Sequence, residues 1–141
     1  MRSTQQCNEV VGDSLWWAAM LAIGIASVAN ALIYALASLF GVELRVALIP
    51  GQPPQPLALG LVVFTTVLAA LLATGLLAVL LRVTDRPVRT LQWIALVVLV
   101  LSLAGPLFQA VGATATLLLI LMHLMTAGVV VGVLSTVRRH A

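Results

Sequence analysis

Apolar residues gather into four long stretches along the chain, and nearly all charged residues lie between or outside them. The stretches cover approximately residues 15–40, 57–81, 90–111 and 114–135, and none contains Asp, Glu, Lys or Arg. A helix needs about 20 apolar residues to cross a hydrocarbon layer of about 30 Å. The pattern therefore predicts an all-α protein, a bundle of four transmembrane helices that forms a single membrane domain over residues 1–141.

Composition excludes the common soluble classes. Hydrophobic residues make up 62% of the chain and charged residues 8%, and the mean hydropathy is +1.19. An ordinary soluble domain has about a quarter of its residues charged. The net charge is only +3, so we expect no nucleic-acid partner, and the lipid bilayer is the expected surrounding.

The arginines predict the orientation of the bundle. With four spans, one side holds both termini and the middle connector, and it carries Arg2, Arg82, Arg86, Arg89, Arg138 and Arg139. The opposite side holds only Arg45. Positive residues concentrate on the cytoplasmic side, so both termini are predicted to be cytoplasmic. Trp16, Trp17 and Trp93 would lie at the same interface, where indole rings are enriched.

The first apolar stretch is interpreted as a retained helix. Ala29-Asn30-Ala31 has the small-x-small form of a signal-peptide cleavage site. However, the apolar run continues to Phe40, and Glu9 and Asp13 precede it, which is not typical of a secretory signal. We therefore expect a membrane helix, capped at its start by Asp13 or Ser14.

The connector at residues 41–56 is rich in proline, with prolines at positions 50, 53, 54 and 56. Proline lacks a backbone donor and interrupts helices. The first part, residues 41–49, is predicted to be a short extended or interfacial piece, and the second part a stiff spacer. The connector could be an external lid or recognition loop, or simply a link between two helix ends, and we favour the link.

The last two helices need a break between them. Residues 91–134 contain no charge and as one helix would be about 66 Å long at 1.5 Å per residue, twice the membrane thickness. Gly105, Pro106 and Gly112 mark the region of the break. Either a tight turn falls within 105–114, or Pro106 kinks the end of the third helix and the turn falls at Gly112.

Polar side chains at membrane depth are the main guide to function, because burying unpaired polar groups in hydrocarbon costs several kcal/mol. His123 lies near the middle of the fourth helix. At comparable depth the other helices carry Ser27, Asn30 and Tyr34 at helical spacing on the first, Thr65 or Thr66 on the second, and Ser102 on the third. If these faces converge, they form a polar patch inside the bundle. The candidate ligand-binding residues are Asn30, Tyr34, Thr66, Ser102 and His123.

The sequence leaves two interpretations of His123 open. It could belong to a ligand, proton or cofactor site, or it could stay neutral and hydrogen bond to Asn30, Ser102 or a backbone carbonyl between helices. A membrane haem usually needs two axial ligands, and the conceivable second ligands are Met20, Met122 and Met125. We predict no cofactor and no metal site, with haem as a weak alternative, since no second histidine or carboxylate lies in the spans.

Two further features concern packing and lipid. Gly128 and Gly132 form a GxxxG motif, which allows close helix approach. The motif could be a homodimer seam or an intrachain contact, and we favour the intrachain contact. The cytoplasmic arginines at positions 82, 86, 89, 138 and 139 could bind anionic lipid head groups. We favour a role in setting topology.

Several short segments resemble a known family. They are GVEL after the first helix, RPVRT followed by a tryptophan, LSLAGP, MHL in the last helix and a terminal basic pair. Over residues 15–139 the chain resembles small four-helix bacterial membrane proteins that are classified as a domain of unknown function. One departure is Gly132-Val133-Leu134, where the family would have Ile-Pro, so the last helix is expected to be straighter. The resemblance implies the fold and the bacterial plasma (inner) membrane, and makes Ser102, Pro106 and His123 the first residues to test.

Two function classes follow. The favoured one is a non-enzymatic accessory or interaction protein, whose partner is a second copy or another membrane protein. The alternative is a membrane protein that handles a small molecule, proton or cofactor through the patch around His123. An enzyme is less favoured, because the sequence shows no paired carboxylates, activated nucleophile, phosphate-binding loop or metal cluster.

Overall fold

The computed structural model describes residues 2–47 and 53–137, and side chains from residue 14 onward within those ranges. In chain order the elements are α1 (Arg2–Leu39), β1 (Arg45–Val46), β2 (Gln55–Pro56), α2 (Leu59–Val83), α3 (Pro87–Ser102), α4 (Ala104–Gln109) and α5 (Ala113–Leu134). Four helical segments are long and apolar enough to cross a membrane: Ser14–Leu39, Leu59–Val83, Pro87–Gln109 and Ala113–Leu134. The prediction of an all-helical chain with four such segments is therefore confirmed.

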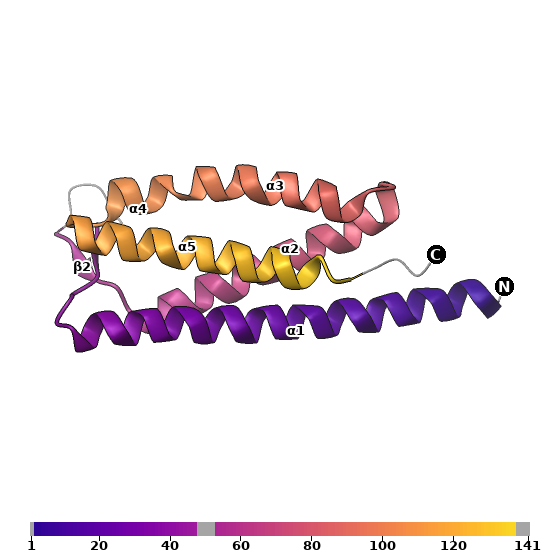
Figure 1. Cartoon of the computed structure of the whole chain (residues 1–141), viewed down its shortest axis with the longest axis horizontal. Helices are drawn as coiled ribbons and strands as arrows, with labels where there is room; N and C mark the ends of the chain where they lie inside the picture. The colour runs from indigo at the N-terminus through magenta and orange to yellow at the C-terminus, as the bar shows by residue number, and fades with distance from the viewer. Residues whose placement is uncertain (1, 48–52, 138–141) are drawn as a thin grey trace.

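The start of α1 differs from the prediction. The helix begins at Arg2, and both Asp13 and Ser14 lie within it, so the expected cap at these residues is wrong. The apolar part, Ser14–Leu39, still matches the predicted span. The extra turns project past the α2–α3 connector at the end of the molecule where both termini lie (Figure 1). Polar residues can continue a helix outside the apolar segment, because helix formation propagates easily once a helix exists.

Helix α1 lies on one side of the bundle and α3 with α4 on the opposite side, and α2 and α5 lie between them (Figure 1). Helix α1 packs against α2 and α5, and α3 packs against the same two helices from the other side. Helix α2 runs obliquely, from beside α1 at its start to beside α3 at its end (Figure 1). Because of this slant, α2 and α3 meet at the end that holds the termini and diverge toward the opposite end.

The third span is interrupted near its end. This agrees with the predicted alternative in which Pro106 distorts the end of the third helix and the turn falls at Gly112. Helix α3 ends at Ser102. Leu103 keeps a helical conformation with φ −65° and ψ −17°, and α4 follows along the same side of the bundle as α3 (Figure 1). Pro106 has no N–H to donate to the carbonyl of Ser102, which explains the break. The chain reverses at Gly112, whose φ of +93° suits glycine.

A small strand cap covers the end where α2 and α3 diverge, here called the hairpin end. Strand β1 pairs with β2 in antiparallel fashion, Arg45 opposite Pro56. On its other side β1 bonds to the α4–α5 turn: the N–H of Ala47 donates to the carbonyl of Gln109 at 2.8 Å. The predicted extended piece is thus present as β1, while residues 48–52 of the predicted spacer lie outside the described residues. The cap joins the two connectors at this end.

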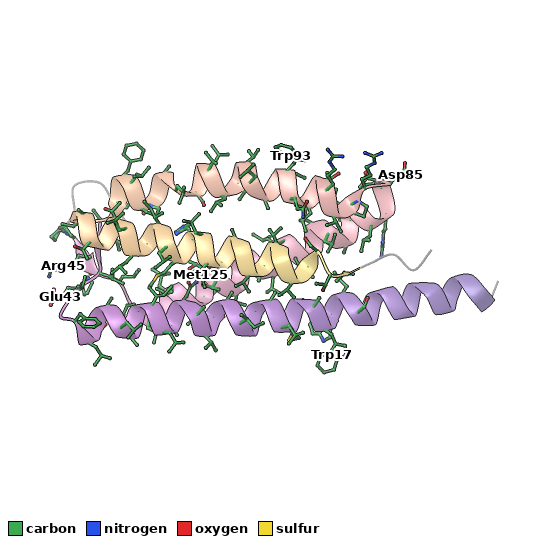
Figure 2. All side chains as sticks on the ribbon, viewed as in Figure 1. Trp17, Glu43, Arg45, Asp85, Trp93 and Met125 are labelled. Atoms are coloured by element: carbon green, nitrogen blue, oxygen red, sulfur yellow. The ribbon has the colours of Figure 1, made fainter. Side chains whose placement is uncertain are left out.

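Charged side chains lie at the two ends of the bundle. Glu43 and Arg45 lie at the hairpin end, and Asp85 lies at the other end (Figure 2). The Oε2 of Glu43 is 3.5 Å from the Nε of Arg45. Both side chains are exposed, and such an ion pair contributes little to stability. Trp17 and Trp93 point outward from opposite sides of the bundle (Figure 2).

Candidate functional site

A cavity of about 590 Å³ lies between α2, α3, α4 and α5, with Asn30 of α1 at its base. The cavity exists because α3 packs less closely against the bundle than the other helices do. In an apolar 18-residue stretch of the third span 11% of the residues are buried, half the share in the matching stretch of each of the other three spans. Helices α3 and α4 bury only Pro87 and Leu91 near the start and Pro106 near the end. Between Leu91 and Pro106 the span stands off the bundle, and the cavity occupies the space.

The cavity opens between α2 and α3. Its lining on α2 includes the exposed residues Thr65 and Leu72, and its lining on α3 includes the exposed Val98. All lining residues on α5 are buried or half-buried. The open side therefore faces the apolar exterior of the helices. At the hairpin end the cavity is lined by Val46 and Leu57 of the strand cap and by Gln109.

Asn30 joins three helices at the base of the cavity. Its side chain is 2% exposed, and its Nδ2 donates to the Oγ1 of Thr66 on α2 at 2.9 Å and to the Oγ1 of Thr126 on α5 at 2.7 Å. Thr66 itself donates to the carbonyl of Val62 at 2.8 Å, so it can only accept from Asn30. This fixes the orientation of the Asn30 amide, with both hydrogens used.

The same orientation leaves the Oδ1 of Asn30 buried without a hydrogen-bond partner among the residues that the structure describes. The Oγ of Ser27, one turn earlier on α1, is also buried and without a partner. An unsatisfied buried acceptor costs about 1–3 kcal/mol. At the base of the cavity, Asn30 therefore presents an acceptor without a partner, whereas Ser27 does not line the cavity.

His123 lies on the α5 wall of the cavity, half-buried. Its Nδ1 is 2.8 Å from the carbonyl oxygen of Leu119, one turn earlier. A carbonyl can only accept, so Nδ1 carries the hydrogen, and in the neutral ring Nε2 is left as an acceptor. No described residue bonds to Nε2. Of the two interpretations of His123, the structure shows a bond to a backbone carbonyl, but within its own helix rather than between helices.

The structure brings most of the predicted patch together. Asn30, Thr66, Ser102 and His123 all line the one cavity. Ser102 donates to the carbonyl of Leu99 at 2.8 Å, within α3. Tyr34 does not line the cavity, because its hydroxyl donates to the carbonyl of Leu57 at 2.9 Å and so ties α1 to the start of α2.

Sequence reasoning missed Thr126 and Gln109, which also line the cavity. Thr126 lies three residues after His123, a spacing that places both on one face of a helix. That spacing was the available signal. Gln109 was not predictable in this way, because its position depends on the break at Pro106 and on the strand cap.

The conceivable haem ligands do not gather at His123. Met122 is buried and lines the cavity, while Met20 lies on an exposed face of α1. Met125 is 38% exposed and does not line the cavity. Among the described residues no group of three or more His, Cys, Asp or Glu side chains could hold a metal ion.

The remaining candidate residues lie on the surface. Gly128 and Gly132 are exposed, and a Cβ built at either one would meet nothing within 4 Å. The described part of the chain therefore makes no close contact at this motif. Arg82, Arg86 and Arg89 are exposed around the α2–α3 connector, and Arg138 and Arg139 lie outside the described residues.

The fold and the cavity define a class: an all-helical protein with four helices long and apolar enough to span a membrane and a partly open apolar cavity between them. The chain belongs to a family of unknown function, DUF6069, whose model matches residues 11–140. Neither a curated protein nor a solved structure matches the chain. The family agrees with the resemblance seen in the sequence, and it assigns no activity.

Proposed function

We propose that this protein binds a hydrophobic small molecule within the membrane, in the cavity between α2, α3 and α5. The cavity is the observation that carries the proposal. Its volume of about 590 Å³ lies within the range of small-molecule sites, about 300–1,000 Å³. Its walls are mainly apolar and carry a few polar groups, among them His123 and Thr126 on α5, as binding sites for amphipathic molecules do.

The route of entry supports a ligand that comes from the bilayer. The open side lies between α2 and α3, within the length of the two apolar spans. A molecule dissolved in the hydrocarbon layer would enter sideways without crossing water. At the hairpin end the strand cap contributes the apolar side chains of Val46 and Leu57 to the lining, which disfavours entry of a polar solute past them.

The decisive experiment is native mass spectrometry of the protein purified in a mild detergent. The wild-type protein should retain a hydrophobic molecule. Ala95 lines the cavity on α3, and Ala95→Phe fills part of the space without removing a polar group. This variant should lose the bound molecule. Val97→Phe, at a 57% exposed position on the same helix, is the matched control and should retain it. A wild-type protein that is bare, or equal retention by Ala95→Phe, would contradict the proposal.

We also propose that the bundle lies in a bacterial plasma membrane with both termini in the cytoplasm. By their positions in the sequence, six of the seven arginines belong to the terminal segments or flank the α2–α3 connector. Arg82, Arg86 and Arg89 are exposed there, where they can contact lipid phosphates at about 1 kcal/mol each. The positive-inside rule supports this orientation.

A second candidate function is that of a non-enzymatic interaction subunit, supported by the exposed Gly128 and Gly132. Small residues allow close backbone approach between membrane helices. If the motif joins two copies, the Gly128→Leu and Gly132→Leu double variant should be monomeric where the wild type is dimeric, as measured by light scattering in detergent. A wild type that is already monomeric would rule out the homodimer.

A further inference from the structure

Besides the Oδ1 of Asn30 at the base, the α5 wall of the cavity carries two hydrogen-bonding groups without a partner among the described residues, and these two have opposite character. The first is the Nε2 of His123, an acceptor in the neutral ring because Nδ1 donates its hydrogen to the carbonyl of Leu119 at 2.8 Å. His123 is half-buried and lines the cavity. No described residue donates to Nε2, so the cavity presents a free acceptor at this point.

The second group is the hydroxyl of Thr126, a free donor. Its Oγ1 accepts from Asn30 at 2.7 Å, but its hydrogen reaches no acceptor among the described residues. Thr66 and Thr74, by contrast, donate to carbonyls of their own helix, at 2.8 Å each. Thr126 and His123 are three residues apart on α5, about 5–6 Å between Cβ atoms. They therefore present a donor and an acceptor side by side on the cavity wall.

Apart from His123, the described lining of the cavity has no ionisable side chain to pair with an ion. Its lining contains neither Arg nor Lys, and neither Asp nor Glu. A phosphate, carboxylate or ammonium group placed there would lose its hydration without gaining an opposite charge, which costs several kcal/mol. With His123 neutral, the polar end of a ligand bound there is therefore also neutral.

From these three observations we infer that the ligand is a neutral amphiphile whose polar end is a hydroxyl group, an alcohol or a phenol. A hydroxyl has one hydrogen to donate to the Nε2 of His123 and lone pairs to accept from Thr126. An ether or ketone oxygen can only accept, and it leaves Nε2 unpaired. The inference rests on the proposed binding function and specifies its ligand class.

The test compares three probes that share one apolar tail: 4-dodecylphenol, 4-dodecylanisole and 4-dodecylbenzoate. Each is titrated into the full-length protein at a fixed detergent concentration and pH 8, and its relative affinity is taken from the rise in the unfolding midpoint. The phenol should bind about tenfold more tightly than the anisole, the effect of one hydrogen bond to a buried acceptor. The benzoate, which is ionised, should bind more weakly than the phenol.

The variants locate the contact. In His123→Phe the ratio of the affinities for the phenol and the anisole should fall to about one. In Leu124→Phe, at the neighbouring exposed position, this ratio should stay as in the wild type. His123→Leu serves the same purpose if the Phe variant does not fold. Thr126→Val should lower the affinities for the phenol and the anisole by a similar factor, since the oxygen of either probe accepts from the Thr126 hydroxyl.

The outcomes separate the inference from the function on which it rests. If the wild type binds phenol and anisole equally, or binds benzoate most tightly, the hydroxyl assignment is wrong while the binding function stands. If no probe raises the midpoint, both the assignment and the proposed function are contradicted. An unchanged preference in the folded His123→Phe variant would remove His123 from the site.

Discussion

The side-chain amide of Asn30 on α1 donates to the hydroxyl of Thr126 on α5 at 2.7 Å, across 96 positions of the sequence. This bond, with its companion to Thr66, joins the first, second and last spans at one level of the bundle. In this bond the Thr126 oxygen is the acceptor, so the Thr126 hydroxyl hydrogen is left to donate to a ligand in the cavity. One contact thus contributes both to the packing and to the site.

The Asn30–Thr126 bond should be measurable by a double-mutant cycle. Asn30→Ala should destabilise the protein by about 2 kcal/mol, and its coupling to Thr126→Val should be about 0.6–1.7 kcal/mol, the range for hydrogen bonds between membrane helices. Reversible unfolding in mixed micelles gives the free energies. Thr74→Val is the control, because Thr74 donates within α2 and does not contact Asn30. Coupling to Thr74 as large as that to Thr126 would contradict the assignment.

Tyr34 should hold the strand cap onto α1. In Tyr34→Phe the carbonyl of Leu57 loses its donor at 2.9 Å, and the free energy of unfolding should fall by about 1 kcal/mol. Amide exchange should become faster at Leu57, whose N–H donates to the carbonyl of Leu44 at 2.7 Å. Ser38→Ala removes an exposed hydroxyl that bonds within α1, and it should change neither quantity. Unchanged exchange in Tyr34→Phe would show that the cap is held by packing.

Two Gly→Ala substitutions should have effects of opposite sign. Gly112 has φ +93°, a conformation that side chains rarely adopt, so Gly112→Ala should destabilise the protein by about 1–2 kcal/mol. Gly75 lies within α2 with nothing within 4 Å of an added Cβ, so Gly75→Ala should stabilise it by up to about 1 kcal/mol. Thermal unfolding in detergent measures both. A Gly112→Ala variant as stable as the wild type would mean that the turn does not need a positive φ, and a destabilised Gly75→Ala variant would contradict the prediction for α2.

The proposed orientation can be checked with the one cysteine of the sequence, Cys7. A membrane-impermeant maleimide should label Cys7 in inside-out vesicles and not in sealed right-side-out vesicles. In a Cys7→Ser background, Glu43→Cys should show the reverse, because the exposed Glu43 lies at the hairpin end. Labelling of both positions from one side would contradict a four-span arrangement.

The patterning of the sequence predicted the four spans closely, because an apolar segment must be long enough to cross hydrocarbon and must satisfy its backbone within itself. It also selected Asn30, Thr66, Ser102 and His123, which line one cavity. Polar residues at membrane depth are few, so their presence stands out. The start of α1 was placed wrongly, because nothing in the local pattern forces a helix to begin at the edge of its apolar segment.

What the sequence determined by itself is the number of spans, their lengths and the depth of the polar residues along each one, since these depend on local composition. The tertiary structure decided the rest. The slant of α2 and the break at Pro106 separate α3 from the bundle, and this separation makes the cavity. It also decided that Tyr34 ties down the cap, that Thr126 joins Asn30, and that Nε2 of His123 stays free. Such relations depend on how helices far apart in the sequence are tilted and rotated against one another, and no local pattern specifies that.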